Sequence, residues 1–313
     1  DGEILSVTSS NISQGHRFHH QGELVISSAD NYQAELLAAN VVADYQARQE
    51  TISVEIEKAL LTYAISITQQ YKTPQLQVRQ TNLQTDGSFE PKVGQKVSMI
   101  LPLALDSAAL FSNFKSKLRS QIRKAEKNGL TVELGNNKKF IELFYQVFSR
   151  NMRRLGSPVH DKSFFQELGE QYKDNMIVSI VKLGDVVVGA GVVLISHDCA
   201  AIPWASTHEK YNNLAPNMLL YWSLLKFVSD NGIKTFDFGR SSYGEGTYRF
   251  KKQWGAKPHA LVWRTFISGS EITVSKEAGK TGFARTFVEK IWRHLPLNIA
   301  NFIGPKIRKY ISL

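Results

Sequence analysis

The 313-residue chain has a single cysteine, Cys199, and no apolar run that approaches the roughly 20 residues of a membrane-spanning helix. One thiol cannot form an internal disulfide, so a disulfide-stabilised secreted scaffold is excluded and a reducing compartment is indicated. The apolar, strand-like surroundings of Cys199 predict a buried, unreactive thiol. No signal-peptide pattern stands at the N-terminus, so we expect a cytoplasmic protein.

Acidic residues are scarce relative to basic ones. The chain has 38 Lys and Arg against 28 Asp and Glu, which gives a net charge of +10 and a pI near 9.5. This excess predicts attraction to anionic partners such as nucleic acid, a phosphorylated glycolipid or a membrane surface. The hydrophobic content of 42% indicates globular cores rather than disorder, and the length suits one large or two ordinary domains.

Residues 1–22 are polar and contain three histidines, His16, His19 and His20. No acidic or thiol side chain accompanies them in a metal-ligand spacing, so we expect a tail or loop and no metal site.

Hydrophobic spacing predicts an alternation of strands and helices over the rest of the chain. The expected helices are 53–71, 138–155, 216–230 and one that Asp161 or Ser163 caps and that ends at Tyr172. The expected strands are 23–26, 75–79, 96–103, 131–134, 176–182, 186–196, 200–206, 234–238 and 259–267.

Residues 110–128 predict one strongly basic helix that ends at Gly129. Its apolar residues recur three or four positions apart, and Glu126 is the only acid on it. Its basic residues are Lys115, Lys117, Arg119, Arg123, Lys124 and Lys127. A solvated helix face usually mixes both signs of charge, so binding of phosphate or nucleic acid and a plain exposed face both stay open.

The stretches 200–206, 216–230 and 234–238 predict a strand, a helix and a second strand. Such a βαβ unit has parallel strands. Ligands of open α/β sheets bind outside the carboxyl ends of the strands, which here are residues 204–206 and 239–241.

The second of these ends opens the stretch 236–257, FDFGRSSYGEGTYRFKKQWGAK. Its glycines allow backbone to lie close to a ligand. Its charged residues are Asp237, Arg240, Glu245, Arg249, Lys251 and Lys252. Charges crowded in this way face either a substrate or water, so a solvated hairpin loop is the alternative to a ligand site.

Four blocks of sequence in this order resemble one family. They are LRSQIRKAEKNGLTVE (118–133), NMRRLGSPVHDKSFF (151–165), PWASTHEKYNNLAPNMLLYW (203–222) and FDFGRSSYGEGTYRFKKQWGA (236–256). Together they closely resemble the FemAB-related proteins associated with exosortase/PEP-CTERM systems, within the Fem group of peptidyltransferases. The resemblance covers roughly residues 24–313.

The Fem group is similar in fold to the GNAT acyltransferases. The resemblance therefore implies an α/β (α+β) mixed sheet, the GNAT-like acyl-CoA N-acyltransferase fold, in two tandem domains of which the first is partial or divergent. The expected divisions are a polar tail (1–22), a first domain (23–95), a second domain that carries the site (96–270) and basic amphipathic C-terminal helices (271–313).

The implied reaction is transfer of an aminoacyl or acyl group to an amine of an anionic cell-envelope or exopolysaccharide precursor. In the Fem group a motif of Phe-Lys, two residues, an aromatic residue and glycine places a lysine at the transfer site. It carries over to Phe250 and Lys251, followed by Trp254. We expect Lys251 to stabilise the developing oxyanion, with Glu245 as the catalytic base and Asp237 as a second candidate.

Further side chains are predicted to bind substrate. Arg240 and Arg249 suit phosphate or carboxylate groups as bidentate partners. The other predicted contacts are Trp204, Asn217, Tyr248, Phe250 and Trp254, although such aromatic residues are also typical of a core.

The donor follows from a missing glycine. GNAT enzymes bind the coenzyme A pyrophosphate with a glycine-containing loop, and the equivalent residues 208–217 contain none. Backbone amides approach a pyrophosphate poorly without glycine. The missing glycine therefore argues against coenzyme A, and we expect no bound cofactor. The resemblance to the Fem group implies an aminoacyl-tRNA donor, with a coenzyme A-dependent N-acyltransferase as the alternative.

The tail 284–313 mixes aromatic and aliphatic residues with lysine and arginine. It predicts either a helix in an anionic membrane interface, at the inner face of the cell membrane, or a helix docked on the protein body. A non-catalytic, membrane-associated binding protein with the same fold is thus a further alternative.

Overall fold

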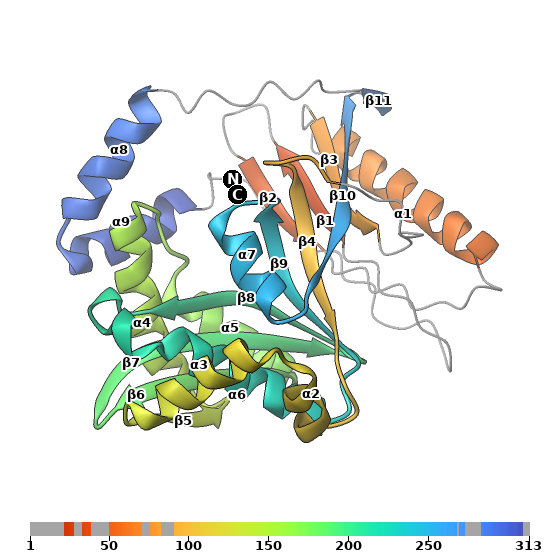
Figure 1. The fold of residues 1–313 in the computed structure, drawn as a ribbon. Coiled ribbons are helices and arrows are strands. Elements are labelled where there is room, and N and C mark those ends of the chain that lie inside the picture. The colour runs from red at the N-terminus through yellow and green to blue at the C-terminus, as the bar shows by residue number, and fades with distance from the viewer. Residues whose placement is uncertain are drawn as a thin grey trace. The chain divides into compact units, whose positions relative to one another are not determined.

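The computed structural model describes residues 22–27, 33–38, 50–70, 75–82, 91–267, 269–272 and 283–308 (Figure 1). The chain divides into two compact units. Unit 1 comprises residues 1–91, 259–280 and 307–313, and unit 2 comprises residues 92–258 and 281–306. The predicted histidine-containing tail lies outside the described residues, and the predicted domain boundaries stay a prediction.

Unit 1 is an antiparallel sheet with one helix. Its strand order is β2-β1-β3-β10, and β11 pairs with β10. The strands are β1 (Gly22–Ser27), β2 (Gln33–Ala38), β3 (Gln75–Asn82), β10 (Lys257–Ile267) and β11 (Ser270–Ile272). Helix α1 (Glu50–Gln70) confirms the predicted helix and buries Ala64 and Ile67.

Unit 2 contains a mixed sheet in the order β4-β9-β8-β7-β6-β5. Its strands are β4 (Lys96–Pro102), β5 (Leu130–Gly135), β6 (Met176–Leu183), β7 (Val186–Ser196), β8 (Cys199–Thr207) and β9 (Thr235–Ser242). Neighbours are antiparallel except β8 and β9, which are parallel. The predicted βαβ unit is confirmed, with α6 (Pro216–Asp230) as its crossover helix. Cys199 is buried, as predicted.

Helices cover both faces of this sheet. On one face α4 (Lys138–Leu155) and α5 (Lys162–Tyr172) pack their aromatic residues on Val178, Ile180 and Val192. On the other face, Ser179 of β6 hydrogen-bonds Ser223 of α6 at 2.8 Å. Side chains of a strand alternate between the faces, so α4 and α6 lie on opposite sides. Short 3₁₀ helices precede β6 (Lys173–Asn175) and α6 (Glu209–Leu214).

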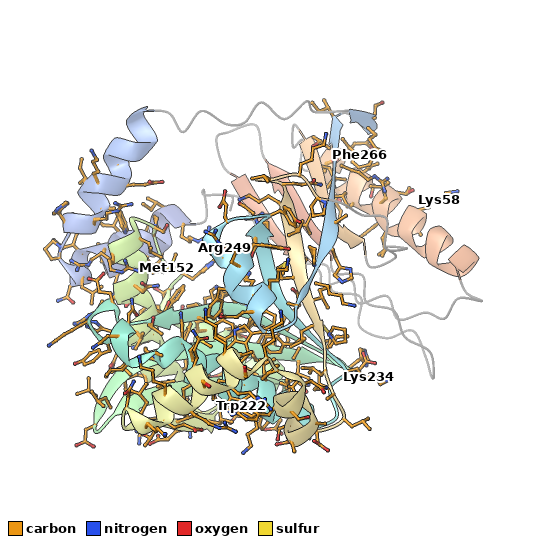
Figure 2. All side chains as sticks on the ribbon, viewed as in Figure 1. Lys58, Met152, Trp222, Lys234, Arg249 and Phe266 are labelled. Atoms are coloured by element: carbon orange, nitrogen blue, oxygen red, sulfur yellow. The ribbon has the colours of Figure 1, made fainter. Side chains whose placement is uncertain are left out.

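The prediction of one basic helix over 110–128 was wrong. The chain forms α2 (Ser107–Asn113) and α3 (Ser116–Lys127) with an extended joint at Phe114. The Phe114 ring is buried between Trp222, labelled in Figure 2, and Trp254, at 5.8 and 5.5 Å between ring centroids. These contacts favour the break, because a continuous helix would carry Phe114 away from both rings.

The charged stretch is not a loop throughout. Strand β9 continues to Ser242, and residues 246–253 form a helix that was not predicted, α7 (Gly246–Gln253). Tyr248, Lys251 and Trp254 recur at intervals of three and are all buried. Helical spacing was thus present in the sequence, but the charged residues and glycines around it concealed the pattern.

The tail forms two helices, α8 (Phe283–His294) and α9 (Leu297–Arg308). They dock on α4: Arg153 donates to the Leu295 carbonyl at 2.8 Å, and Trp292 is buried. In the described part of the chain, no helix combines the length and apolar character needed to cross a membrane.

Candidate functional site

The parallel strands β8 and β9 pair over a short distance and then part. Their register holds Cys199 opposite Thr235, Ala200 opposite Phe236 and Ala201 opposite Asp237. Beyond these pairs β8 continues to Thr207 beside β7, and β9 continues to Ser242 beside β4. Backbone amides and carbonyls of 202–207 and 238–242 that face the gap are therefore not joined in a β8–β9 ladder, and such an edge can pair with an extended ligand.

A β-bulge shapes β9 at this point. Ser98 lies opposite Arg240 and Ile100 opposite Asp237, so two residues of β9 oppose one residue of β4. Gly239 takes φ +73°, a conformation that favours glycine. The Asp237 carboxylate stabilises the bulge, since its Oδ1 accepts hydrogen bonds from the Gly239 amide at 2.7 Å and from the Ser98 hydroxyl at 3.0 Å.

Lys251 reaches the bulge from α7. Its Nζ donates to the carbonyl oxygens of Gly239 and Arg240, each at 2.9 Å. The side chain is only 9% exposed. Burial lowers the pKa of Lys251 from 10.5 to about 8, the nearby Asp237 charge opposes this shift and the Arg240 charge adds to it. The predicted oxyanion-stabilising residue is thus a buried cation beside the parting strands.

The structure brings several predicted residues close to Lys251 along β9 and α7. Glu245 stands at the N-cap of α7, and Glu245, Arg240 and Arg249 are exposed. Asp237, the second candidate base, is buried and bound within the bulge. Its contacts give it a structural role.

The aromatic residues of this stretch lie in the core. Trp254 is 1% exposed, and Phe250 and Tyr221 lie at 6.3 and 6.1 Å from it between ring centroids. Tyr248 is also buried, against Tyr243. These rings fix the position of α7, and through it that of Lys251.

Trp204 and Asn217 stand apart from this group. Trp204 packs on Phe165 at 5.1 Å between ring centroids, on the sheet face covered by α4. Asn217 is exposed in the first turn of α6, on the opposite face. Neither side chain has a described contact with Lys251.

The glycine-free loop before α6 adopts a glycine-like conformation nevertheless. Ala215 takes φ +63°, which is uncommon for a residue with a side chain. Asn128 anchors this turn by donating to the Leu214 carbonyl at 3.1 Å. The missing glycine therefore does not fix the backbone shape of this loop, and it argues against coenzyme A less strongly than the sequence suggested.

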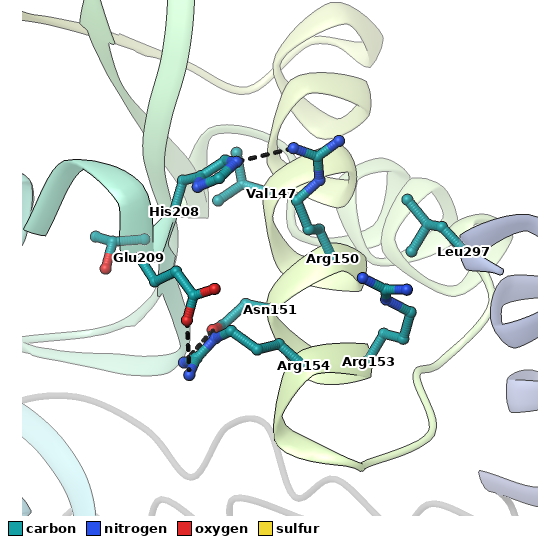
Figure 3. Close-up of a pocket in the computed structure, with 9 residues that line it drawn as sticks. Val147, Arg150, Asn151, Arg153, Arg154, His208, Glu209 and Leu297 are labelled. Atoms are coloured by element: carbon teal, nitrogen blue, oxygen red, sulfur yellow. Dashed lines mark hydrogen bonds and ion pairs between the residues drawn. The ribbon is translucent and has the colours of Figure 1, made fainter. Parts of the chain in front are cut away.

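A pocket of about 260 Å³ lies at the carboxyl end of β8 on the α4 face (Figure 3). This pocket was not predicted from the sequence. Its lining residues are Val147, Arg150, Asn151, Arg153, Arg154, Thr207, His208, Glu209 and Leu297. Three arginines at positions i, i+3 and i+4 of α4 share one helix face, and this spacing was the signal that could have revealed the pocket.

The pocket is positively charged. Arg150 donates to His208 Nε2 at 2.8 Å, so the ring accepts there and carries its proton on Nδ1. The 3.4 Å contact from the Lys210 amide to Nδ1 is then no hydrogen bond. Burial first, and the Arg150 charge second, lower the pKa of His208, which keeps the ring neutral at pH 7.

One ion pair limits that charge only in part. Glu209 pairs with Arg154 at 3.3 Å, which leaves three arginines against one carboxylate, a net charge of +2 in the lining. Arg153 Nε is buried and has no hydrogen-bond partner among the described residues. An anion with two negative charges would complement this lining. Within the described ranges, no group of His, Cys, Asp and Glu could hold a metal ion.

Different parts of the chain match different protein families. Residues 112–252 match the family model described as an acetyltransferase (GNAT) domain. Residues 1–76, which include most of the predicted first domain, match the model of the glycyl-tRNA synthetase β subunit. The GNAT match ends beside Lys251 and includes the parting strands, α7 and the arginine pocket up to Glu209.

The fold of part of the chain is similar to the crystal structure of FemX, with a TM-score of 0.52 and 15% identity over 68% of this chain and 77% of that one. The fold is therefore a mixed-sheet α/β fold of the GNAT type. The glycine–tRNA ligase β subunit of Colwellia psychrerythraea is 51% identical over 57 residues, and that of Natranaerobius thermophilus is 45% identical over 53. The chain spans only 8% of each ligase subunit.

The lowered pKa of Lys251 predicts a pH-dependent stability. Between about pH 8 and 10.5 the folded state binds fewer protons than the unfolded state, so the free energy of unfolding should rise with pH by at most roughly 3 kcal/mol. Replacement of Lys251 by Met should abolish this rise. Urea unfolding at several pH values between 7 and 10 measures it.

The difference between wild type and Lys251→Met isolates the lysine. Burial also raises the pKa of Tyr145 and of Tyr221 to about 12, which lowers stability above pH 10, but both proteins share this effect. Lys252→Met is the matched control, because Lys252 is exposed on the same helix. Parallel curves for wild type and Lys251→Met would contradict the assignment.

Proposed function

We propose that the chain is an acyltransferase that forms an amide bond, with an aminoacyl-tRNA as donor and an anionic envelope or exopolysaccharide precursor as acceptor. One observation carries the proposal: the parallel strands part beside a buried lysine whose pKa is lowered. The GNAT match over 112–252 agrees with it. An association with exosortase/PEP-CTERM systems, which the sequence motifs suggest, is part of the same proposal.

The reaction needs three things from the protein. The acceptor amine attacks the carbonyl carbon of the donor ester, the C–N bond forms through a tetrahedral oxyanion, and the C–O bond to the donor ribose then breaks. A proton leaves the nitrogen, and one joins the departing oxygen. The protein has to align the two substrates, stabilise the oxyanion and receive the proton.

Lys251 meets the second requirement. Two of its three ammonium N–H groups donate to the carbonyls of Gly239 and Arg240, and the third has no partner among the described residues. An ammonium held in this way, in a site with little water, stabilises an oxyanion more strongly than one in bulk solvent. Glu245, exposed at the start of α7, is the residue available to receive the proton.

The donor slot is the gap between β8 and β9. An extended acyl donor can pair with those backbone groups of 202–207 and 238–242 that are engaged neither by a neighbouring strand nor by Lys251 and Asp237, which sets its carbonyl near the bulge. A tRNA donor also needs a cationic surface, and α3 supplies one. Lys115, just before α3, and four basic residues of α3 are exposed: Lys117, Arg123, Lys124 and Lys127. The similarity of 1–76 to a tRNA ligase subunit covers little of that protein, and the proposal does not rest on it.

In this proposal the arginine pocket binds the acceptor substrate. It lies on the α4 face, whereas α3 packs against α6 on the other face. A cavity of 260 Å³ has the volume of about nine water molecules, so it suits a phosphate-bearing fragment rather than a whole tRNA. A phosphate group of the precursor would balance the net charge of the lining.

Two alternative functions can be distinguished from this proposal by experiment. A coenzyme A-dependent N-acyltransferase would bind acetyl-coenzyme A saturably, and the left-handed Ala215 before α6 is the observation that favours it. A non-catalytic binding protein would bind the precursor but would turn over no donor. Calorimetry with acetyl-coenzyme A and a turnover assay with charged tRNA distinguish them.

The first prediction of this proposal concerns catalysis. Lys251→Met should lower kcat at least about 100-fold in aminoacyl transfer, because the oxyanion loses its cation. Lys252→Met should change kcat less than about threefold, since its ammonium lies over the Tyr248 ring at 5.6 Å. Single-turnover transfer from radiolabelled aminoacyl-tRNA measures both. Equal, small effects of the two substitutions would exclude Lys251 from catalysis.

The second prediction concerns the pocket. Arg150→Gln should weaken binding of inorganic pyrophosphate about 10- to 100-fold, because a charge-assisted hydrogen bond is lost. Lys138→Gln is the control on the same helix, since Lys138 is 80% exposed and pairs with Glu170 outside the pocket. Isothermal titration calorimetry measures both affinities. Unchanged pyrophosphate binding in Arg150→Gln would show that the anion binds elsewhere.

A further inference from the structure

The two C-terminal helices distribute their apolar residues in an unusual way. Small residues of α9 face the body: Ala300 is 2% exposed, and a Cβ on Gly304 would come within 3.2 Å of the Val159 amide nitrogen. Large apolar side chains face outward instead. They are Val288 and Ile291 on α8 and Ile299, Phe302 and Ile303 on α9.

These outward residues are well exposed, Phe302 at 67% and Val288 at 57%. Among the side chains of α8 that the structure describes, residues 288–294, Trp292 is the buried large apolar one, and close packing of Glu289 on Gly156 holds α8 against the end of α4. The two helices therefore dock on the protein body without using their outward apolar side chains. Val288 and Ile291 lie about one turn apart on α8, as do Ile299, Phe302 and Ile303 on α9, and exposed apolar faces of this kind mark a site of interaction.

The charge of the same segment indicates the partner. Residues 283–308 contain five basic residues, Arg285, Lys290, Arg293, Lys306 and Arg308, and one acid, Glu289, which gives a net charge of +4. Lys290, Arg293 and Lys306 are exposed, whereas Arg308 is buried. Lys306 stands over the exposed Phe302 ring, 3.9 Å from its centroid. A lysine beside an exposed aromatic residue is typical of helices that lie in a membrane interface, where the ring enters the acyl region and the ammonium reaches the headgroups.

We propose that the outward faces of α8 and α9 bind the surface of an anionic membrane. A protein partner fits less well, since the cation over the exposed Phe302 ring is a lysine, Lys306, and protein interfaces are depleted of lysine. A second copy of the chain would bring two +4 segments together, and like charges repel. The proposal does not depend on the acyltransferase function, and it would place that activity beside a lipid-linked or membrane-proximal acceptor.

Vesicle co-sedimentation of the full chain tests this inference. The vesicles are phosphatidylcholine alone and phosphatidylcholine with 30% phosphatidylglycerol, about the charge density at which headgroup attraction is strong. We expect binding to the anionic vesicles and little to the neutral ones. Phe302→Gln should lower the partition coefficient about tenfold through loss of apolar burial, and Lys306→Gln about fivefold through loss of headgroup attraction.

Leu105→Gln is the matched control, because Leu105 is 96% exposed at the start of unit 2, away from these helices, and its loss should leave binding unchanged. Sedimentation velocity of wild type and Phe302→Gln gives the second arm. A dimer that Phe302→Gln converts to monomer, without vesicle binding, would make the surface a contact between copies and overturn the proposal. Equal vesicle binding by wild type and Phe302→Gln would overturn it as well.

Discussion

The attachment of the Lys251 ammonium to the bulge in β9 is the contact on which the rest of the site depends. It joins α7 to the strand at the point where β8 and β9 have parted, and it holds the carbonyls of Gly239 and Arg240 in place. The Asp237 carboxylate stabilises the same bulge from the β4 side. A buried ammonium costs free energy of solvation, which the two carbonyls and the nearby carboxylate offset only in part, as the lowered pKa records.

Opposite faces of one sheet carry different positively charged surfaces. The exposed basic residues of α3 lie on the α6 side and form a convex surface suited to a polyanion. The arginines of α4 line a small concave pocket on the other side, at the end of β8. Because β8 borders both the gap and the pocket, its carboxyl end is where a donor and an acceptor approaching from the two faces could meet.

The sequence predicted those elements whose ends carry local signals. Helix α4 was predicted from Lys138 to Leu155, as observed, because Asn137 caps its start and the left-handed Gly156 ends it. Helix α6 begins at Pro216 and ends at Asp230, just before the Asn231-Gly232 turn. The break at Phe114 could not be predicted, because it depends on Trp222 and Trp254, which are remote in sequence.

The residues of the candidate site also differ in whether a local sequence pattern could reveal them. Lys251 was predicted from one short motif and Arg240 from the charged stretch just before it, since a strand and the helix after it hold them near each other. The pocket joins α4, the turn at His208 and the helix that begins at Leu297, three segments separated by more than fifty residues. No local sequence pattern indicates that these three segments lie together. The aromatic residues near Lys251 were expected to touch substrate, yet Trp254 and Tyr248 are buried, where packing against other rings positions them.

The central claim is that the donor lies between β8 and β9. Hydrogen–deuterium exchange of the full chain, with and without a non-hydrolysable aminoacyl-RNA analogue in which an amide replaces the ester, tests it most directly. The account predicts slower exchange at backbone amides of 202–207 and 238–242 when the analogue binds. Bound analogue that leaves both segments unprotected, and protects amides elsewhere, would contradict it.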